Sequence, residues 1–217
     1  MFAFTLAEVL ITLVIIGVIA AITVPTLITK YQKEQTVTRL KKVYSTLSQT
    51  TARAIADNGP IETWEIGLPN NSNDAISFIN KYIAPYINII KAPKDISEGW
   101  DSIFYLLNGN EASYGEGDVR FYISDGTSVT SYIYKNSNST VIRLDMYIDI
   151  NGDKKPNKVG RDIFFFIYDL KQGIFSPINP SSSRNDILSN CNKQKSGTYC
   201  ATLIMKDSWQ IKDDYPW

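Results

Sequence analysis

The chain has 217 residues, with 22 basic and 22 acidic side chains, two cysteines and no histidine. This length accommodates one membrane anchor and one ordinary domain, and the balanced charge argues against nucleic acid or another polyanion as the main partner. The missing histidine excludes His-based acid–base catalysis, nucleophile–His pairs and His zinc sites, and no other catalytic constellation is found, so we expect no enzymatic activity.

The first expected element is a membrane-spanning helix over residues 4–24. This segment is apolar, Gly or Thr except for Glu8, and it has about the length that spans a bilayer. It lacks the basic n-region and the following small-residue cleavage site of a secretory signal peptide. Glu8 needs an explanation, because a carboxylate in such a helix costs about 2.5–3.5 kcal/mol near the membrane centre and less toward an end.

The helix is expected to continue through residues 25–59 as an amphipathic segment. Apolar and small side chains there advance by three and four positions, as one helical stripe does: Val37, Leu40, Tyr44, Leu47, Thr51 and Ala54. The sequence Asp57-Asn58-Gly59-Pro60 then ends the helix. We therefore predict one helix from Thr5 to about Ala56, bent near the membrane surface by Pro25.

Residues 60–217 are predicted to form a globular domain. Asn73 and Asp74 are expected to cap a short helix that ends near Pro85. Asp125-Gly126 predicts a two-residue hairpin turn, and YCATLIMKD (199–207) predicts a short helix. Strands are predicted over SIFYLL (102–107), VRFYIS (119–124), TSVTSYIY (127–134), TVIRLDMYID (140–149), RDIFFFIYDL (161–170) and, as an edge strand, IFSPI (174–178). The fold class is α+β, a long N-terminal helix packed on an antiparallel β-sheet.

The loop DINGDKKPNKVGRD is a candidate calcium site. Its oxygen ligands are Asp149, Asn151, Asp153, Asn157 and Asp162. Carboxylate and amide oxygens near a glycine suit this hard cation. Four basic residues in the loop and the lack of a bidentate Glu favour the alternative, a polar connection in which the Asp and Asn side chains form hydrogen bonds with their own backbone.

Four spaced carboxylates, Asp145, Asp149, Asp162 and Asp169, are expected to mark solvated strand faces rather than an acid–base pair.

The two cysteines, Cys191 and Cys200, lie nine positions apart on either side of a turn signal at Ser196-Gly197. A disulfide between them would be worth about 2–3 kcal/mol and would place the domain in an oxidising compartment. The alternative is a pair of unrelated buried thiols.

The N-terminal segment FTLAEVLITLVIIGVIAAITVP resembles that of type IV pilins and of the pseudopilins of type II secretion systems. The family pattern has a cleavage point before a Phe, a Glu as fifth residue of the mature chain, an apolar helix and a Pro twenty-one residues after the Phe. Phe4, Glu8 and Pro25 match it. The resemblance implies that residues 1–3 are a leader, that a prepilin peptidase cuts between Ala3 and Phe4, and that the new amino group of Phe4 is methylated. Ala3 departs from the usual Gly, and the three-residue leader lacks the usual basic charge.

The resemblance also implies a pilin-like fold and a function, that of a structural subunit of a type IV pilus-like or type II secretion filament. Its partners would be other pilin or pseudopilin subunits, the prepilin peptidase, an inner-membrane assembly platform and membrane lipid, with no nucleic acid. In the filament, a neighbour's N-terminal ammonium would neutralise Glu8, which would otherwise be unpaired, and so fix the register. Some pseudopilins carry calcium in the region corresponding to the loop 149–162.

The location implied is the bacterial inner membrane, crossed once, with the C-terminal domain outside the cytoplasm. The basic residues after the apolar segment would alone favour a cytoplasmic C-terminus, but the motif and the cysteine pair outweigh them. The alternative function is a membrane-anchored extracytoplasmic binding or enzymatic domain that uses the helix only as a tether. Pilus, competence and secretion systems stay open, as does the choice between a major and a minor subunit.

Overall fold

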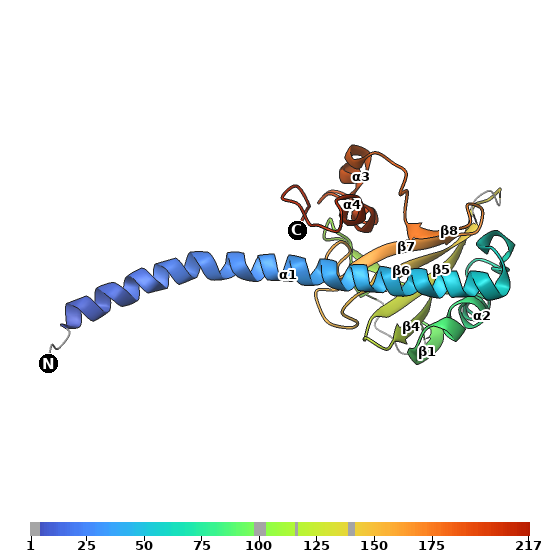
Figure 1. The fold of residues 1–217 in the computed structure, drawn as a ribbon, viewed down its shortest axis with the longest axis horizontal. Coiled ribbons are helices and arrows are strands. Elements are labelled where there is room, and N and C mark those ends of the chain that lie inside the picture. The colour runs from blue at the N-terminus through green and yellow to red at the C-terminus, as the bar shows by residue number, and fades with distance from the viewer. Residues whose placement is uncertain (1–4, 98–102, 116, 139–141) are drawn as a thin grey trace.

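One long helix, α1, runs from Leu6 to Asn58 and projects far beyond the rest of the molecule (Figure 1). The computed structural model describes residues 5–97, 103–115, 117–138 and 142–217. Thr5 caps the start of α1. At its end, the N–H of Gly59 donates to the carbonyl of Ile55 at 2.9 Å, and Gly59 has φ +81°, a backbone conformation that glycine adopts at little cost. The predicted helix from Thr5 to about Ala56 is confirmed.

The two halves of α1 differ in burial, as the sequence predicts. No residue from Thr5 to Val24 is buried, whereas the C-terminal half packs on the domain. Its buried residues are Leu40, Val43, Leu47, Thr50, Thr51 and Ala54. The expected stripe therefore faces the core, and Val43 and Thr50 widen it.

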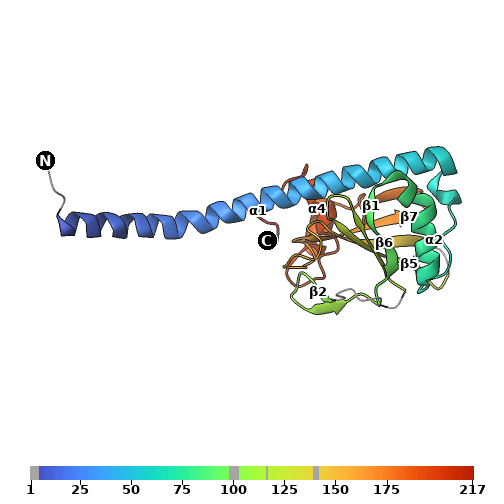
Figure 2. The same cartoon turned by 90° about the horizontal axis from the view of Figure 1, so that it is seen from below.

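Pro25 lies inside α1 and does not end it. A proline there removes one backbone donor and crowds the preceding turn. Figures 1 and 2 show a gentle curve over the N-terminal half of the helix, without a break. The share of this curve that Pro25 causes stays a prediction.

The domain is built on a six-stranded antiparallel sheet in the order β1-β4-β5-β6-β7-β8. Its strands are β1 Ile89–Asp95, β4 Val119–Ile123, β5 Ser128–Lys135, β6 Ile142–Asp149, β7 Ile163–Asp169 and β8 Ile174–Pro177. A separate hairpin joins β2 (Ile103–Tyr105) to β3 (Glu111–Ser113). The α+β class is confirmed, although SIFYLL contributes to this hairpin rather than to the main sheet.

The turn between β4 and β5 is longer than the predicted two-residue turn. Tyr122 pairs with Ser128, and the N–H of Ile123 donates to the carbonyl of Thr127 at 3.1 Å. Three residues, 124–126, therefore form the turn. Gly126 has φ +87°, which a three-residue hairpin requires at its last position.

Short helices complete the domain. Helix α2 spans Ser72–Tyr82, and Asn71 caps it by accepting from the N–H groups of Asn73 and Asp74, so the expected cap at Asn73-Asp74 is displaced toward the N-terminus. Two 3-10 turns cover Ile61–Thr63 and Ala84–Tyr86. Helix α4, Cys200–Lys206, was expected, whereas α3, Arg184–Asn190, was not.

The sheet carries a hydrophobic cluster on each face. Phe164, Phe166 and Tyr168 of β7 belong to the large core that α1 and α2 cover. Ile163 of the same strand packs with Phe104 in a smaller cluster under the β2–β3 hairpin, which lies opposite α1 in Figure 2. The aromatic run of β7 thus serves both faces, because successive strand side chains point in opposite directions.

Candidate functional site

The start of α1 is a capping box made by Thr5 and Glu8. The backbone N–H and the hydroxyl of Thr5 each donate to Glu8 Oε2 at 2.8 Å, and the N–H of Glu8 donates to Thr5 Oγ1 at 3.3 Å. The expected lone charge therefore has partners within its own chain, because the first N–H groups of a helix lack carbonyl acceptors. The T-x-x-E spacing that signals this cap is visible in the sequence. Ala3 and Phe4, the expected cleavage and methylation residues, lie outside the described residues.

The apolar half of α1 presents a large hydrophobic surface. Within the described ranges, α1 is the one helix long and apolar enough to cross a membrane. Leu6, Ile22 and Leu27 are 79%, 68% and 69% exposed. Soluble monomers rarely expose apolar patches of this extent, so the surface fits contact with lipid or with other protein.

The loop 149–162 satisfies its own backbone, as the alternative to calcium predicts. The carboxylate of Asp162 accepts from the N–H groups of Asn157 at 2.9 Å and Lys158 at 2.6 Å, and from the amide of Asn151 at 3.2 Å. Asp149 accepts from the N–H of Asn151 at 3.1 Å, and exposed Asp153 accepts from the hydroxyl of Tyr122. Among the residues with described positions, no three His, Cys, Asp or Glu side chains are arranged to hold a metal ion.

Two features of this loop keep the calcium hypothesis testable. The side-chain oxygens of Asn151 and Asn157 are buried without a hydrogen-bond partner. Burial, with a smaller effect from nearby Asp162, raises the pKa of Asp149 to about 8. Nearby Arg120 lowers this pKa only in part, and a bound cation would lower it further. Calcium at the five predicted ligands stays a prediction.

The spaced strand carboxylates are buried, so the expectation of solvated faces was wrong. Asp145, Asp149, Asp162 and Asp169 expose between 0% and 7% of their surface. Asp145 pairs with the guanidinium of Arg143 at 2.5 and 3.1 Å, while burial raises its pKa. Asp169 accepts from two backbone N–H groups. Each carboxylate has local donors, which is why burial is tolerated.

The C-terminal segment is held by the disulfide Cys191–Cys200, which confirms the predicted pairing. Arg184 donates to Asp207 at 2.6 and 2.7 Å, and these bonds lower the pKa of Asp207. The hydroxyl of Tyr215 donates to the carbonyl of Gly160 at 2.6 Å. Sequence reasoning missed these contacts, because no local pattern joins residues so far apart along the chain.

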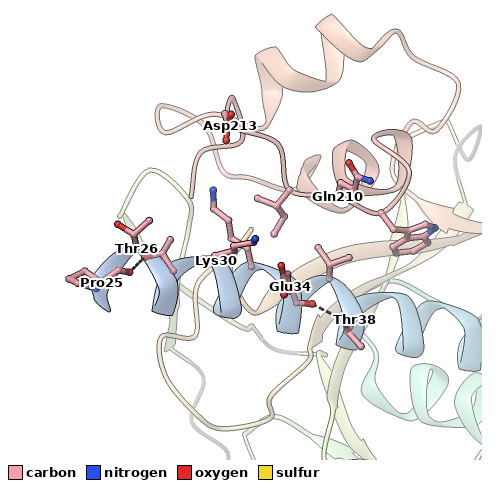
Figure 3. Close-up of a pocket in the computed structure, with 12 residues that line it drawn as sticks. Pro25, Thr26, Lys30, Glu34, Thr38, Gln210 and Asp213 are labelled. Atoms are coloured by element: carbon pink, nitrogen blue, oxygen red, sulfur yellow. Dashed lines mark hydrogen bonds between the residues drawn. The ribbon is translucent and has the colours of Figure 1, made fainter. Parts of the chain in front are cut away.

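A groove of about 960 Å³ separates α1 from the C-terminal segment (Figure 3). Residues from Pro25 to Thr38 of α1 form one wall, and residues 209–213 form the other. Asp213 lies across the groove from Lys30 and Glu34 in the close-up. No local pattern in the sequence signals this groove, since its two walls are more than 170 positions apart.

Comparison with known proteins identifies a family without an assigned function. No curated protein and no solved structure is significantly similar to the chain. Residues 26–217 match the model of a family of unknown function, DUF6613. The match begins directly after Pro25 and covers the amphipathic half of α1 and the whole domain. The chain therefore belongs to the family of unknown function DUF6613.

Proposed function

We propose that the protein is a structural subunit, a pilin or pseudopilin, of a type IV pilus-like or type II secretion filament. The observation that carries the proposal is α1 itself. A helix of 53 residues contains Glu8 and Pro25 of the pilin-like sequence pattern, exposes its apolar half and buries residues of its second half on an antiparallel sheet. An apolar half of this kind suits a subunit that moves from a bilayer into the core of a filament.

The disulfide supports an extracytoplasmic domain, because such bonds persist in oxidising compartments. The bacterial inner membrane would hold the apolar half before assembly. The proposed partners are other subunits, a prepilin peptidase and an assembly platform. The role is structural, with no catalytic step assigned to the chain.

Leader cleavage tests the proposal. Membrane-extracted protein from cells with an active prepilin peptidase is expected to begin at N-methylated Phe4, as read by intact-mass and N-terminal analysis. Cells without the peptidase provide the control, and so does Ala3→Leu, which keeps the segment apolar but enlarges the side chain before the scissile bond. A chain that still begins at Met1 in the peptidase-positive cells would refute the assignment.

A second candidate is the tethered extracytoplasmic domain, and one observation favours it. The capping box with Thr5 gives Glu8 a role in its own helix, so a charge at this position does not require a filament. A tether needs no cleavage at Phe4. The same N-terminal analysis therefore separates the two candidates.

A further inference from the structure

The groove between α1 and the C-terminal segment lies at a definite depth relative to a bilayer. The apolar stretch Leu6–Val24 has 19 residues. At about 1.5 Å per residue it is about 28 Å long, close to the roughly 30 Å of the hydrocarbon core. Pro25 then lies at the edge of the core, and Lys30 and Lys33 lie about 7 and 12 Å beyond it. The headgroup layer extends about 5–7.5 Å beyond the core, so the membrane-side end of the groove opens in it, and helix side chains, which lean toward the helix N-terminus, direct Lys30 and Lys33 back toward this layer.

Charges of both signs line the groove. Lys30 and Lys33 are three positions apart and share a helix face. Lys33 is half-buried, yet neither lysine makes an ion pair with a carboxylate in the described part of the chain. Glu34 and Asp213 add two carboxylates at the same groove. A ligand that carries one phosphate and one ammonium matches this set.

The far wall is held in an unusual conformation. Trp209 has φ +61°, a region that bulky residues rarely enter, and its N–H donates to the carbonyl of Ile204 at 2.9 Å. Its ring centroid lies 5.4 Å from that of Tyr44 on α1. The wall is thus fixed to the helix at one end of the groove. Backbone strain of this kind often accompanies a binding site.

The surface of α1 that borders the groove on its membrane side is apolar. Ile22, Val24 and Leu27 are 68%, 49% and 69% exposed there, next to Thr26 and Lys30 of the groove. A molecule with a charged head and an apolar chain would occupy the groove and cover this surface.

We propose that the groove binds a phospholipid whose headgroup carries a phosphate and a primary ammonium, as phosphatidylethanolamine does. The phosphate contacts Lys30 and Lys33, the ammonium contacts Glu34 and Asp213, and an acyl chain lies along Ile22 and Leu27. Lipid is the occupant because the membrane-side end of the groove opens at the depth of the lipid headgroups, and the balanced charges select a zwitterion over an anionic lipid. The inference rests on the membrane anchoring in the proposed function, not on cleavage or filament assembly.

Native mass spectrometry of the full chain in detergent tests the proposal, with phosphatidylethanolamine, phosphatidylcholine and phosphatidylglycerol added separately. We expect one phosphatidylethanolamine to be retained at least tenfold more tightly than the other two lipids. The double variant Lys30→Gln/Lys33→Gln should lose at least tenfold in affinity. Lys41→Gln/Arg53→Gln, which removes the same charge from exposed positions of α1 outside the groove, should bind as the wild type does.

A second double variant tests the two carboxylates of the groove, Glu34 and Asp213. Glu34→Gln/Asp213→Asn should lower the retention of phosphatidylethanolamine to that of phosphatidylcholine, whose quaternary ammonium donates no hydrogen bond. Equal retention of the three lipids by the wild type would overturn the proposal, as would unchanged binding in the lysine double variant. A photo-crosslinker at Val37 that captures a second copy of the chain instead of lipid would also overturn it. N-terminal analysis of the same samples keeps this outcome separate from the proposed function, because cleavage at Phe4 does not depend on the groove.

Discussion

The role of Glu8 can be separated from that of its cap, because the structure shows which part each substitution removes. Gln also fits the capping box, so Glu8→Gln removes the charge and keeps the cap. Thr5→Val removes the hydroxyl and keeps the charge, at a cost of about 1 kcal/mol for the lost cap. Removing one partner of a buried ion pair costs about 3–5 kcal/mol, which is more than a hundredfold in an equilibrium constant.

If a neighbour's ammonium pairs with Glu8 in a filament, Glu8→Gln should lower filament yield at least a hundredfold. Thr5→Val should lower it by no more than about tenfold, because its cost is below 1.4 kcal/mol. Insertion into the bilayer cannot explain a loss in the Gln variant, since removing a charge makes insertion easier. Filaments would be sheared from cells and quantified by immunoblot at matched membrane levels, with Glu111→Gln, at an exposed strand position, as the control. A Glu8→Gln yield equal to the control would refute the pairing, and equal losses in both variants would assign the effect to the cap.

Three further predictions concern the domain and use a fragment of residues 26–217. Replacing Cys191 and Cys200 by Ser should lower the free energy of unfolding by about 2–3 kcal/mol, measured by denaturant titration. Non-reducing peptide maps that recover both residues as free thiols in the wild type would contradict the disulfide. Millimolar calcium should raise the melting temperature of the wild type more than that of Asp153→Ala, and more than millimolar magnesium raises that of the wild type. Equal calcium-induced shifts in the wild type and in Asp153→Ala would show that the loop 149–162 is only a turn. The folded pKa of Asp149, about 8, lies above its usual 3.8, so its contribution to stability is full below about pH 4 and is lost as the pH rises through 8. Asp149→Asn should therefore reduce the decline in melting temperature between pH 5 and about 8, and an unchanged decline would show that Asp149 does not cause it.

The elements that the sequence predicted well are those with a long local pattern. The stripe from Val37 to Ala54 continues for five turns, and β4 to β7 are runs of five to eight residues rich in β-branched and aromatic side chains. Strand β1 was missed because Pro93 and its lysines conceal the pattern, and its partner β4 defines it instead. Helix α3 was missed because its sequence RNDILSN has only two apolar residues, whereas α4, of the same length, is mostly apolar.

The candidate sites also divide into those that a local sequence pattern predicts and those that it does not. The Cys191–Cys200 pair and the cap at Thr5 depend on short spacings that are readable in the sequence. The burial of Asp145 depends on which segments cover its side of the sheet, and the groove at Lys33 depends on where the C-terminal segment crosses α1. Contacts between distant parts of the chain decide both features, and no local spacing encodes them.

The continuity of α1 has a mechanical consequence. No linker separates its apolar half from the half that packs on the sheet, so the orientation of one half about the helix axis fixes the orientation of the other. Each residue of an α-helix turns the chain by about 100°. One residue inserted between Pro25 and Lys30 would therefore rotate the domain by about 100° about the helix axis relative to the apolar half. Seven inserted residues, about two full turns, would nearly restore the original orientation. A surface of the domain that must meet a neighbour at a fixed angle would tolerate the long insertion better than the short one.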